Sequence, residues 1–438
     1  KSRDFYWYSP VLKRQLESVC ADLVVEPRDE SEVVRALRAC HQHQIPVTAR
    51  GGGTGNYGQA MPLKGGVVLD LSRLDKVKEI SVGRVRAEAG AKLAKIDQLC
   101  QEDSAQELRF HPSTLKMGTI GGFVAGGSSG IGSITWGTLR DRGSILGLRV
   151  ITMEDEPRAI ELRGDAIQKV NHAYGTNGVI TEVEMPLASA YPWVDLIVGF
   201  DDFMTAARFA DALARQDGLP KKLITPLAAP IAEQYFRPLR SRIPEGSSVV
   251  LLMIAEPWLD AFRDFMAAWP AKVLLERAAS DPKRKSLPIY ELSWNHTTLH
   301  ALRIDPTITY LQILYPPPHH LELVEKMHRE FGDEVMVHLE FVRFDGQVAC
   351  FGLPIVRFTS EQRLDEIIRY HEDNGCPIFN PHAYTLEEGG MKQVDHSHLA
   401  FKREADPLGL LNPGKMLGWD NPDLDMSRQS YLYRSLET

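Results

Sequence analysis

The chain has 438 residues, of which 43% are hydrophobic and 25% charged, and its formal net charge at pH 7 is −8. This composition is that of a globular protein of two or three domains. The acidic balance argues against nucleic-acid binding, and the apolar runs are too short to span a bilayer. Five cysteines without CxxC spacing indicate a reducing compartment, so we expect a cytoplasmic protein without a zinc or iron–sulfur site.

The first predicted elements lead to a glycine-rich loop. A strand is predicted at 21–27 and a helix at 32–43, where Val33, Leu37 and Cys40 recur at helical spacing. A second strand then ends in Arg50-Gly51-Gly52-Gly53-Thr54-Gly55-Asn56, and another strand follows at 67–71. Glycine permits positive φ and lets backbone N–H groups converge on an anion, so this loop is typical of a pyrophosphate site.

Two familiar phosphate loops do not fit this stretch. A P-loop ends in Gly-Lys-Ser/Thr, whereas here Gly55 is followed by Asn56 and Tyr57. A Rossmann fingerprint opens a helix, but residues 57–66 carry too much glycine and proline for one. The pattern therefore predicts a phosphate cradle between two strands.

A second glycine-rich segment spans 110–134, after a predicted hairpin at 80–90 and a helix at 92–102. We expect a loop whose glycines let the main chain lie against a flat aromatic ring, with hydroxyls from Thr119, Ser128 and Ser129. A flexible linker is the alternative, but Met117 and Ile120 make the segment more apolar than linkers usually are. A third piece, at 174–183, leads into a strand at 179–185 that closes the first domain.

These three pieces, with Asn412-Pro413-Gly414-Lys415 near the C-terminus, resemble the PCMH-type FAD domain of the vanillyl-alcohol oxidase / p-cresol methylhydroxylase superfamily. The nearest branch is that of glycolate oxidase subunits and D-lactate or D-2-hydroxyglutarate dehydrogenases. The resemblance covers roughly the first 185 residues and the last 30. It implies an α+β protein: a two-subdomain FAD-binding domain at 1–189, an α+β substrate (cap) domain with an antiparallel sheet at 190–409, and a C-terminal return to the FAD domain at 410–438.

The resemblance also implies tightly held, non-covalent FAD and a set of residues that bind it. The expected cofactor-binding residues are Arg50, Gly51, Gly52, Gly53, Thr54, Gly55, Asn56, Pro112, Ser113, Thr114, Gly118, Thr119, Gly121, Gly122, Ala125, Gly126, Ser128, Gly130, Ile131, Gly178, Val179, Ile180 and Asn412.

The second domain reads as strands alternating with helices, which is typical of antiparallel sheets covered by helices on one face. Residues 283–285 read as a solvated basic turn. The predicted strands are 194–199, 248–254, 307–314 and 335–344, and the predicted helices are 202–216, 258–269 and 320–331.

Within this domain, His338 and Glu340 are our first candidates for catalysis. Residues two apart on a strand point to one face, and an imidazole beside a carboxylate is a reasonable general base. The alternative is a structural His–Glu pair on a sheet. Metal-dependent members of the hydroxy-acid branch carry a second histidine, but Asp345 stands near its place and Glu388 replaces another expected histidine. We therefore expect no metal; an oxygen-rich site from His338, Glu340 and Glu387 is the alternative.

Tyr384 and Arg303 complete the expected catalytic set. A tyrosine hydroxyl positions or deprotonates an alcohol in this superfamily, and a packed tyrosine in an ordinary turn is the alternative. Arg303 follows a polar stretch that contains Trp294, and its guanidinium could bind a substrate carboxylate at two points or pair with an acid such as Asp305.

The expected function is that of an FAD-dependent oxidoreductase, a dehydrogenase or oxidase that acts on CH–OH. It would oxidise a small hydroxylated substrate, foremost a 2-hydroxy acid, by hydride transfer to flavin N5. The alternatives are an alcohol or phenolic substrate, and a flavin-binding subunit of an electron-transfer complex. The electron acceptor is left open among oxygen, a quinone, a cytochrome and a flavoprotein, and a homodimer is expected from base rates.

Overall fold

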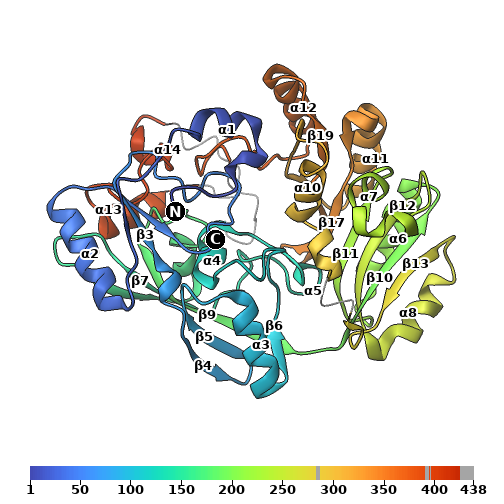
Figure 1. Ribbon diagram of the computed structural model, residues 1–438, viewed down its shortest axis with the longest axis horizontal. Coiled ribbons are helices and arrows are strands. Elements are labelled where there is room, and N and C mark those ends of the chain that lie inside the picture. The colour runs from blue at the N-terminus through green and yellow to red at the C-terminus, as the bar shows by residue number, and fades with distance from the viewer. Residues whose placement is uncertain (283–286, 390–393, 395, 425–438) are drawn as a thin grey trace. The chain divides into compact units, whose positions relative to one another are not determined.

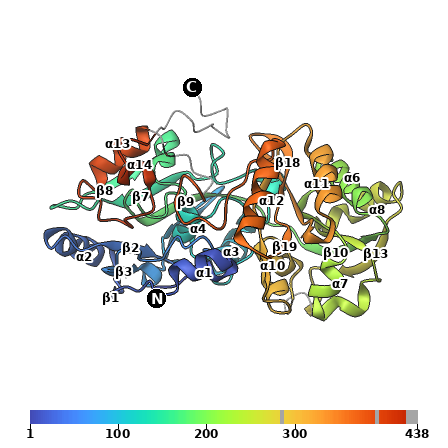
Figure 2. The same cartoon turned by 90° about the horizontal axis from the view of Figure 1, so that it is seen from above.

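A computed structural model describes residues 1–282, 287–389, 394 and 396–424 of the chain (Figures 1 and 2). The expected basic turn at 283–285 lies outside these residues. The chain divides into two compact units. Unit 1 comprises Lys1–Ser129, Leu139–Ala190 and Asn380–Thr438, and unit 2 comprises Gly130–Thr138 and Tyr191–Phe379.

These boundaries differ from the expected ones in two places. The return to unit 1 comes at Asn380 and not at 410, because the chain after Asn380 already bonds to unit 1: His382 Nδ1 lies 2.7 Å from Ser9 Oγ. Residues 130–138 belong to unit 2, where Thr135 Oγ1 donates to the carbonyl of Lys221 at 2.7 Å.

Unit 1 contains a parallel three-stranded sheet that ends at the glycine-rich loop. Its order is β1-β3-β2, with β1 at Leu23–Val25, β2 at Val47–Arg50 and β3 at Val67–Asp70. Helix α2 (Glu30–Gln42) lies beside β2 and β3 (Figure 2), and its buried residues Val33, Leu37 and Cys40 share a core with Val47 and Val67. Asp29 caps this helix by accepting the N–H of Glu32 at 2.9 Å.

The larger sheet of unit 1 is antiparallel, and its order is β4-β5-β9-β7-β8, with β6 paired to β9. Its strands are β4 (Val77–Ser81), β5 (Arg84–Glu88), β6 (Gln106–Leu108), β7 (Gly147–Ile151), β8 (Ala159–Leu162) and β9 (Val179–Ser189). The remaining helices of unit 1 are α1 (Pro10–Leu16), α3 (Leu93–Ser104), α4 (Ile120–Gly126), α13 (His396–Ala405) and α14 (Leu417–Asp420).

Helix α4 corrects the expectation of a loop throughout 110–134. Its N-cap is Thr119, whose Oγ1 accepts the N–H of Gly122 at 3.2 Å. A Cβ at Gly121 would lie 2.5 Å from the Cβ of Ala89, so glycine is needed here for close helix packing. The glycines predicted a loop, but in the structure they allow α4 to pack closely against Ala89.

Unit 2 is built from antiparallel sheets and helices, as expected. The largest sheet has the order β11-β12-β10-β13, and helices α6 and α8 pack against it (Figure 1). Two smaller sheets have the orders β15-β18-β17 and β14-β19-β16. The strands are β10 (Trp193–Phe200), β11 (Lys221–Leu227), β12 (Ser248–Ala255), β13 (Lys272–Arg277), β14 (Ile308–Tyr310), β15 (Ile313–Tyr315), β16 (Val335–Met336), β17 (Leu339–Phe344), β18 (Gln347–Gly352) and β19 (Ile355–Arg357). The helices are α5 (Ser133–Trp136), α6 (Phe203–Ala214), α7 (Ile231–Tyr235), α8 (Leu259–Met266), α10 (Asn295–Leu302), α11 (His320–Phe331) and α12 (Glu361–Asp373).

Two of the expected strands are interrupted. The strand expected at 335–344 breaks into β16 and β17, and His338 lies at the break, where it forms an isolated bridge with Leu227. The strand expected at 307–314 becomes β14 and β15, which lie in different sheets. Among the described residues, no helix has both the length and the apolar character needed to cross a bilayer.

A buried ion pair at the end of α13 joins the C-terminal segment to the rest of unit 1. Lys402 and Asp406 are 2% and 0% exposed, and their side chains meet at 2.6 Å. Lys402 Nζ also donates to the carbonyls of Thr176 at 2.7 Å and Leu411 at 3.2 Å. Three oxygen acceptors around one ammonium group compensate for the removal of its charge from water.

Replacing Lys402 by Met should therefore destabilise the protein by about 3–5 kcal/mol, because Asp406 would be left as a buried, unpaired charge. Urea unfolding would measure the change. Arg403→Met is the matched control: Arg403 is exposed on the same helix, and its loss should cost less than about 0.5 kcal/mol. Equal stability of the two variants would contradict the assigned role of Lys402.

Candidate functional site

Several backbone N–H groups of the glycine-rich loop in unit 1 have no acceptor among the described residues. Among the described residues, the N–H groups of residues 52–56 donate no hydrogen bond to another protein group. Residues 51–55 are half-buried, so these donors lie near the surface of the unit. A run of unpaired N–H groups on a glycine-rich turn is the arrangement that binds an anion.

Arg50 adds a positive charge under this loop. A Cβ at Gly53, where φ is +62°, would lie 1.8 Å from Nη2 of Arg50, so the guanidinium lies directly against the backbone of Gly53. Its Nη1 donates to the carbonyl of Arg3 at 2.7 Å. Burial lowers the pKa of Arg50, against the opposing effects of Asp4 and Asp70. An anion on the loop would meet both backbone N–H groups and this cation.

The second glycine-rich segment lies against the first loop. A Cβ at Gly51 would be 2.2 Å from Thr119 Oγ1, and a Cβ at Gly52 would be 2.4 Å from the carbonyl oxygen of Met117. Thr114 Oγ1 also donates to Thr54 Oγ1 at 3.4 Å. The structure thus brings together two of the expected cofactor-binding groups, 50–56 and 114–122, and only glycine permits this closeness.

The third piece is joined to the second through the end of α4. The carbonyl of Ala125 accepts the N–H of Tyr174 at 2.9 Å. Gly178 has a φ of +106°, and a Cβ there would lie 2.3 Å from Cγ1 of Val150, so it turns the chain tightly into β9, where Val179 and Ile180 follow.

The other expected cofactor residues fall into two groups. Gly126 ends α4, and Pro112, Ser113 and Ser128 lie outside the helices and strands of unit 1, whereas Gly130 and Ile131 belong to the segment of unit 2.

Asn412 has a different place from the one expected. Its Nδ2 donates to the carbonyls of Gln59 at 2.8 Å and Tyr174 at 2.7 Å, and its Oδ1 accepts from Thr48 Oγ1 at 3.4 Å. Both amide hydrogens are used within the protein, and the side chain is 1% exposed. We therefore correct the expectation of a direct cofactor contact: the amide of Asn412 holds the first loop and the third piece together.

Two buried charges beside this loop were missed by the sequence analysis as functional candidates. Lys415 Nζ donates to the carbonyl of Gly58 at 2.6 Å and lies 4.9 Å from the ring centroid of Tyr384. Asp4 accepts the N–H groups of Tyr6 at 3.0 Å and Ala60 at 3.1 Å. Burial lowers the pKa of Lys415 and raises the pKa of Asp4. In the sequence, Lys415 stood out only as a member of the Asn-Pro-Gly-Lys motif, and no pattern indicated that Asp4 would be buried.

Tyr384, the expected catalytic tyrosine, is half-buried in unit 1. Its ring packs against the cluster of Tyr6, Leu12, Leu16 and Met61. Among the described residues its hydroxyl has no hydrogen-bond partner, so it could engage a ligand.

His338 and Glu340 form a closed network inside unit 2. They are 0% and 1% exposed, and His338 Nε2 lies 2.9 Å from Glu340 Oε1. His338 Nδ1 lies 3.0 Å from the carbonyl of Leu353, so both ring nitrogens face protein acceptors. Glu340 also accepts from Thr225 Oγ1 at 2.6 Å and from the N–H of Trp294 at 2.6 Å. The imidazole has no open nitrogen, which argues against the expected general-base role.

Arg303 is exposed at the C-cap of α10, and its guanidinium makes no hydrogen bond or ion pair with the residues that the structure describes. Within the same residues, no cluster of three or more His, Cys, Asp or Glu side chains is arranged to hold a metal ion. Glu387 instead accepts the N–H groups of Leu417 at 2.9 Å and Gly418 at 2.8 Å.

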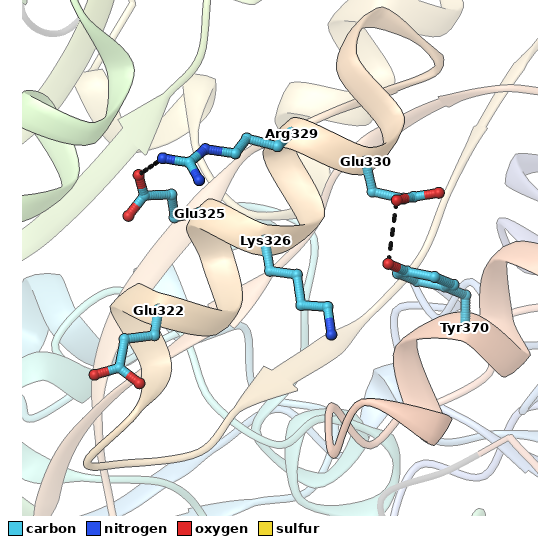
Figure 3. A pocket seen from close by; sticks show the side chains of 6 residues that line it. All are labelled: Glu322, Glu325, Lys326, Arg329, Glu330 and Tyr370. Atoms are coloured by element: carbon cyan, nitrogen blue, oxygen red, sulfur yellow. Dashed lines mark hydrogen bonds and ion pairs between the residues drawn. The ribbon is translucent and has the colours of Figure 1, made fainter.

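A surface pocket on unit 2 contains none of the expected site residues. It lies between α11 and α12, and Figure 3 shows two contacts among its lining residues: Arg329 with Glu325, and Tyr370 with Glu330. The lining residues are Glu322, Glu325, Lys326, Arg329, Glu330 and Tyr370. This lining, which mixes acidic and basic side chains of two helices, is that of a solvated helix surface.

Comparison with known proteins gives these features a context. Residues 21–158 match a family described as FAD binding domain. The chain is 28% identical over 174 residues to the glycolate oxidase subunit GlcD of Bacillus subtilis, which covers 38% of this chain and 37% of that protein. It is 30% identical over 176 residues to the mitochondrial D-lactate dehydrogenase [cytochrome] of Arabidopsis thaliana, which covers 38% of this chain and 30% of that protein. The chain thus spans about a third of the length of these relatives.

The solved structure of alkyldihydroxyacetonephosphate synthase has a similar fold over most of the chain. Its TM-score is 0.67, and the alignment covers 90% of this chain and 76% of that protein. Because the sequences are only 17% identical, the likeness concerns the fold alone.

The matched segment contains β2, the glycine-rich loop and α4. Its unpaired backbone donors and the guanidinium of Arg50 fit the pyrophosphate of FAD, and a side chain at Gly51, Gly52 or Gly53 would collide with the neighbouring atoms that shape the cradle. Residues 21–158 therefore match the FAD binding domain family in both sequence and local structure, and FAD is the cofactor of this protein.

Proposed function

We propose that this protein is an FAD-dependent oxidoreductase that oxidises the CH–OH group of a small hydroxylated substrate, foremost a 2-hydroxy acid. The observation that carries the proposal is the cradle of unpaired N–H groups over Arg50 within the segment that matches the FAD binding domain family. The names of two relatives, glycolate oxidase subunit and D-lactate dehydrogenase, support a 2-hydroxy acid.

The cofactor is proposed to bind through the residues expected from the sequence. Asn412 would support them indirectly, because its amide holds the first loop and the third piece together. Arg50 and the N–H groups of residues 52–56 would hold the pyrophosphate, while Thr54, Thr114 and Thr119 would offer hydroxyl groups. When bound, FAD would supply the acceptor for the substrate hydride.

The chain's own residues must then hold the substrate and take the proton of its hydroxyl group. Tyr384 is our proposal for the hydrogen bond that positions the substrate hydroxyl group, because its own hydroxyl has no partner among the described residues and the ammonium of Lys415 lies 4.9 Å from its ring centroid. Arg303 remains the proposed ligand of a substrate carboxylate, since its guanidinium is exposed and unpaired in the described part of the chain. His338 and Glu340 are proposed as positioning residues that hold the backbone of Trp294.

An alcohol or phenolic substrate is the second candidate. It is favoured by Tyr384 and by the aromatic surroundings of Trp294, whose ring centroid lies 6.5 Å from that of Phe351. A small-molecule substrate is common to both candidates. The electron acceptor is proposed to be oxygen, a quinone, a cytochrome or a flavoprotein, the location cytoplasmic, and the assembly a homodimer.

Replacing Gly53 by Ala should lower the affinity for FAD at least about tenfold. The new Cβ would collide with the guanidinium of Arg50 and would strain a backbone with a φ of +62°. Fluorescence titration of the apoprotein with FAD would measure the loss. Gly143→Ala is the control, because Gly143 has a φ of +85° but no heavy atom within 4 Å of its Cβ position. Equal FAD affinity of both variants would show that the cradle is not the cofactor site.

Replacing Tyr384 by Phe should lower kcat by about 100-fold or more, because the substrate hydroxyl would lose the hydrogen bond that positions it for reaction. The variant should keep its full content of FAD. Steady-state kinetics with the best substrate and the visible spectrum of the purified protein would measure both. The control is Tyr370→Phe, since the hydroxyl of Tyr370 donates to Glu330 on the surface of unit 2. Unchanged kcat in Tyr384→Phe would remove this residue from the proposed mechanism.

Anaerobic mixing of the FAD-loaded protein with D- and L-2-hydroxy acids and with benzylic alcohols should bleach the visible flavin band with at least one class. Bleaching by a 2-hydroxy acid is the expected result, and re-oxidation in air would distinguish an oxidase from a dehydrogenase. Bleaching by alcohols alone would select the second candidate. Bleaching by neither would reject both substrate classes in favour of an electron-relay subunit.

A further inference from the structure

Lys415 is a buried cation whose ammonium contacts two parts of unit 1. It is 0% exposed, and among the described residues its Nζ makes one hydrogen bond, to the carbonyl of Gly58 at 2.6 Å. The same ammonium lies 4.9 Å from the centroid of the Tyr384 ring. A carbonyl and a ring face attract an ammonium, but they do not neutralise the charge that has been removed from water.

The opposite charge comes from Asp4, which is 4% exposed. Burial lowers the pKa of Lys415, and the negative charge of Asp4 opposes this effect. Burial likewise raises the pKa of Asp4, and the charges of Lys415 and Arg50 oppose it. In the part of the chain that the structure describes, no hydrogen bond or ion pair joins Asp4 to either cation, so the three groups act on one another through space.

Three bonds hold the turn 55–60, which continues the glycine-rich loop. At its start the N–H of Phe5 donates to the carbonyl of Gly55 at 2.6 Å. In its middle the ammonium of Lys415 binds the carbonyl of Gly58, and at its end the carboxylate of Asp4 accepts the N–H of Ala60 at 3.1 Å. The unpaired N–H groups of residues 52–56 lead directly into this turn, so its position affects where they point.

Stability alone does not account for two charges in this place. A buried pair of opposite charges contributes little net stability, because the cost of desolvation offsets most of the attraction, and apolar side chains of similar volume often stabilise a protein as well or better. The charged groups add direction, since each binds a backbone group at a defined position, which an apolar side chain does not do.

We propose that Asp4 and Lys415 are positioning residues of the cofactor site. As a charged pair they fix the turn 55–60 and thereby aim the N–H groups of residues 52–56 at the pyrophosphate of FAD. Lys415 also holds the ring of Tyr384, so one ammonium links the cofactor loop to the residue proposed to position the substrate. The first role rests on FAD as the cofactor, and the second rests on the proposed function.

The test compares Lys415→Met, Asp4→Asn and the double variant by fluorescence titration of the folded apoproteins with FAD. Each single variant should bind FAD at least about tenfold more weakly than the wild type. The double variant should recover part of the melting temperature that Lys415→Met loses, because no unpaired charge remains buried. Its FAD affinity should stay low, because the carbonyl of Gly58 still lacks its donor.

Asp22→Asn is the matched control. Asp22 also accepts a backbone N–H that follows the loop, that of Gly66 at 2.7 Å, but its side chain is exposed. This variant should bind FAD within about twofold of the wild type. ADP, which carries a pyrophosphate but no flavin, should compete with FAD less well in both single variants and equally well in the control.

The pH dependence of FAD affinity gives a readout that a purely structural role would not change. Burial lowers the pKa of Lys415 to about 7, while Arg50 keeps its charge. Lys415 therefore loses its proton as the pH rises through this value, which leaves the charge of Asp4 unpaired. The FAD affinity of the wild type should fall as the pH rises from 6 to 9, and that of Lys415→Met should stay level.

The contact with Tyr384 is tested by two further variants. Tyr384→Leu removes the ring and should weaken FAD binding about fivefold, because the ammonium loses the ring face beside it. Tyr384→Phe keeps the ring and should bind FAD as the wild type does. Equal affinities of these two variants would overturn the link between the loop and Tyr384.

Two results would overturn the positioning role of the pair. FAD affinity unchanged in both single variants would show that the turn does not need the charges. Wild-type affinity in the double variant would show that the pair serves stability alone. None of these titrations depends on turnover, so failure of the proposed function would appear separately, as a protein that binds FAD but is bleached by no substrate class.

Discussion

The cradle in unit 1 depends on the amide of Asn412 more than on any other single group. Its two N–H bonds join the carbonyl of Gln59, just after the glycine-rich loop, to that of Tyr174, before β9. These residues are far apart in the sequence, and each lies next to an expected cofactor segment. One fully buried side chain thus fixes the relative positions of the loop and the third piece, while Lys402 and Lys415 hold the adjoining backbone through Thr176, Leu411 and Gly58.

In this arrangement the glycines and the residues near the C-terminus have different structural roles. The glycines supply the unpaired donors and the closeness between the loop and the segment before α4, but they contribute no side chains that could hold the shape. The buried amide of Asn412 and the ammonium groups of Lys402 and Lys415 hold the backbone around the loop in place. An anion can then bind to donors that are already in place, so little ordering entropy has to be lost on binding.

Much of this organisation could be predicted from the sequence, because it depends on local patterns. The helix that buries Val33 and Leu37 follows from the spacing of apolar residues, and the cradle follows from the run of glycines between two strands. Helix α4 was not predicted, because the propensity of glycine opposes a helix. Its contact with Ala89 is a tertiary effect that no local pattern encodes.

The residue types of the candidate site could be predicted from the sequence, but the positions and contacts of their side chains could not. The pairing of His338 with Glu340 was expected, yet their other hydrogen bonds are made with Leu353, Thr225 and Trp294, which belong to other segments of unit 2. The backbone of Trp294, whose φ is +51°, is likewise held by a long-range bond from its N–H to Glu340. Asp4 carried no signal because a single acidic residue near the start of a chain usually faces solvent.

The interleaving of the two units limits how such a protein can be recombined. The chain crosses from one unit to the other four times, after Ser129, Thr138, Ala190 and Phe379. Neither unit is a continuous cassette, since residues 130–138 belong with 191–379 and residues from 380 onward belong with the first 129. A chimaera that imported unit 2 of a relative would need both of its segments at once, because the segment 130–138 is bonded to the carbonyls of Lys221 and Lys222. Variation in this architecture should therefore arise by point substitution within a unit more readily than by exchange of a whole unit.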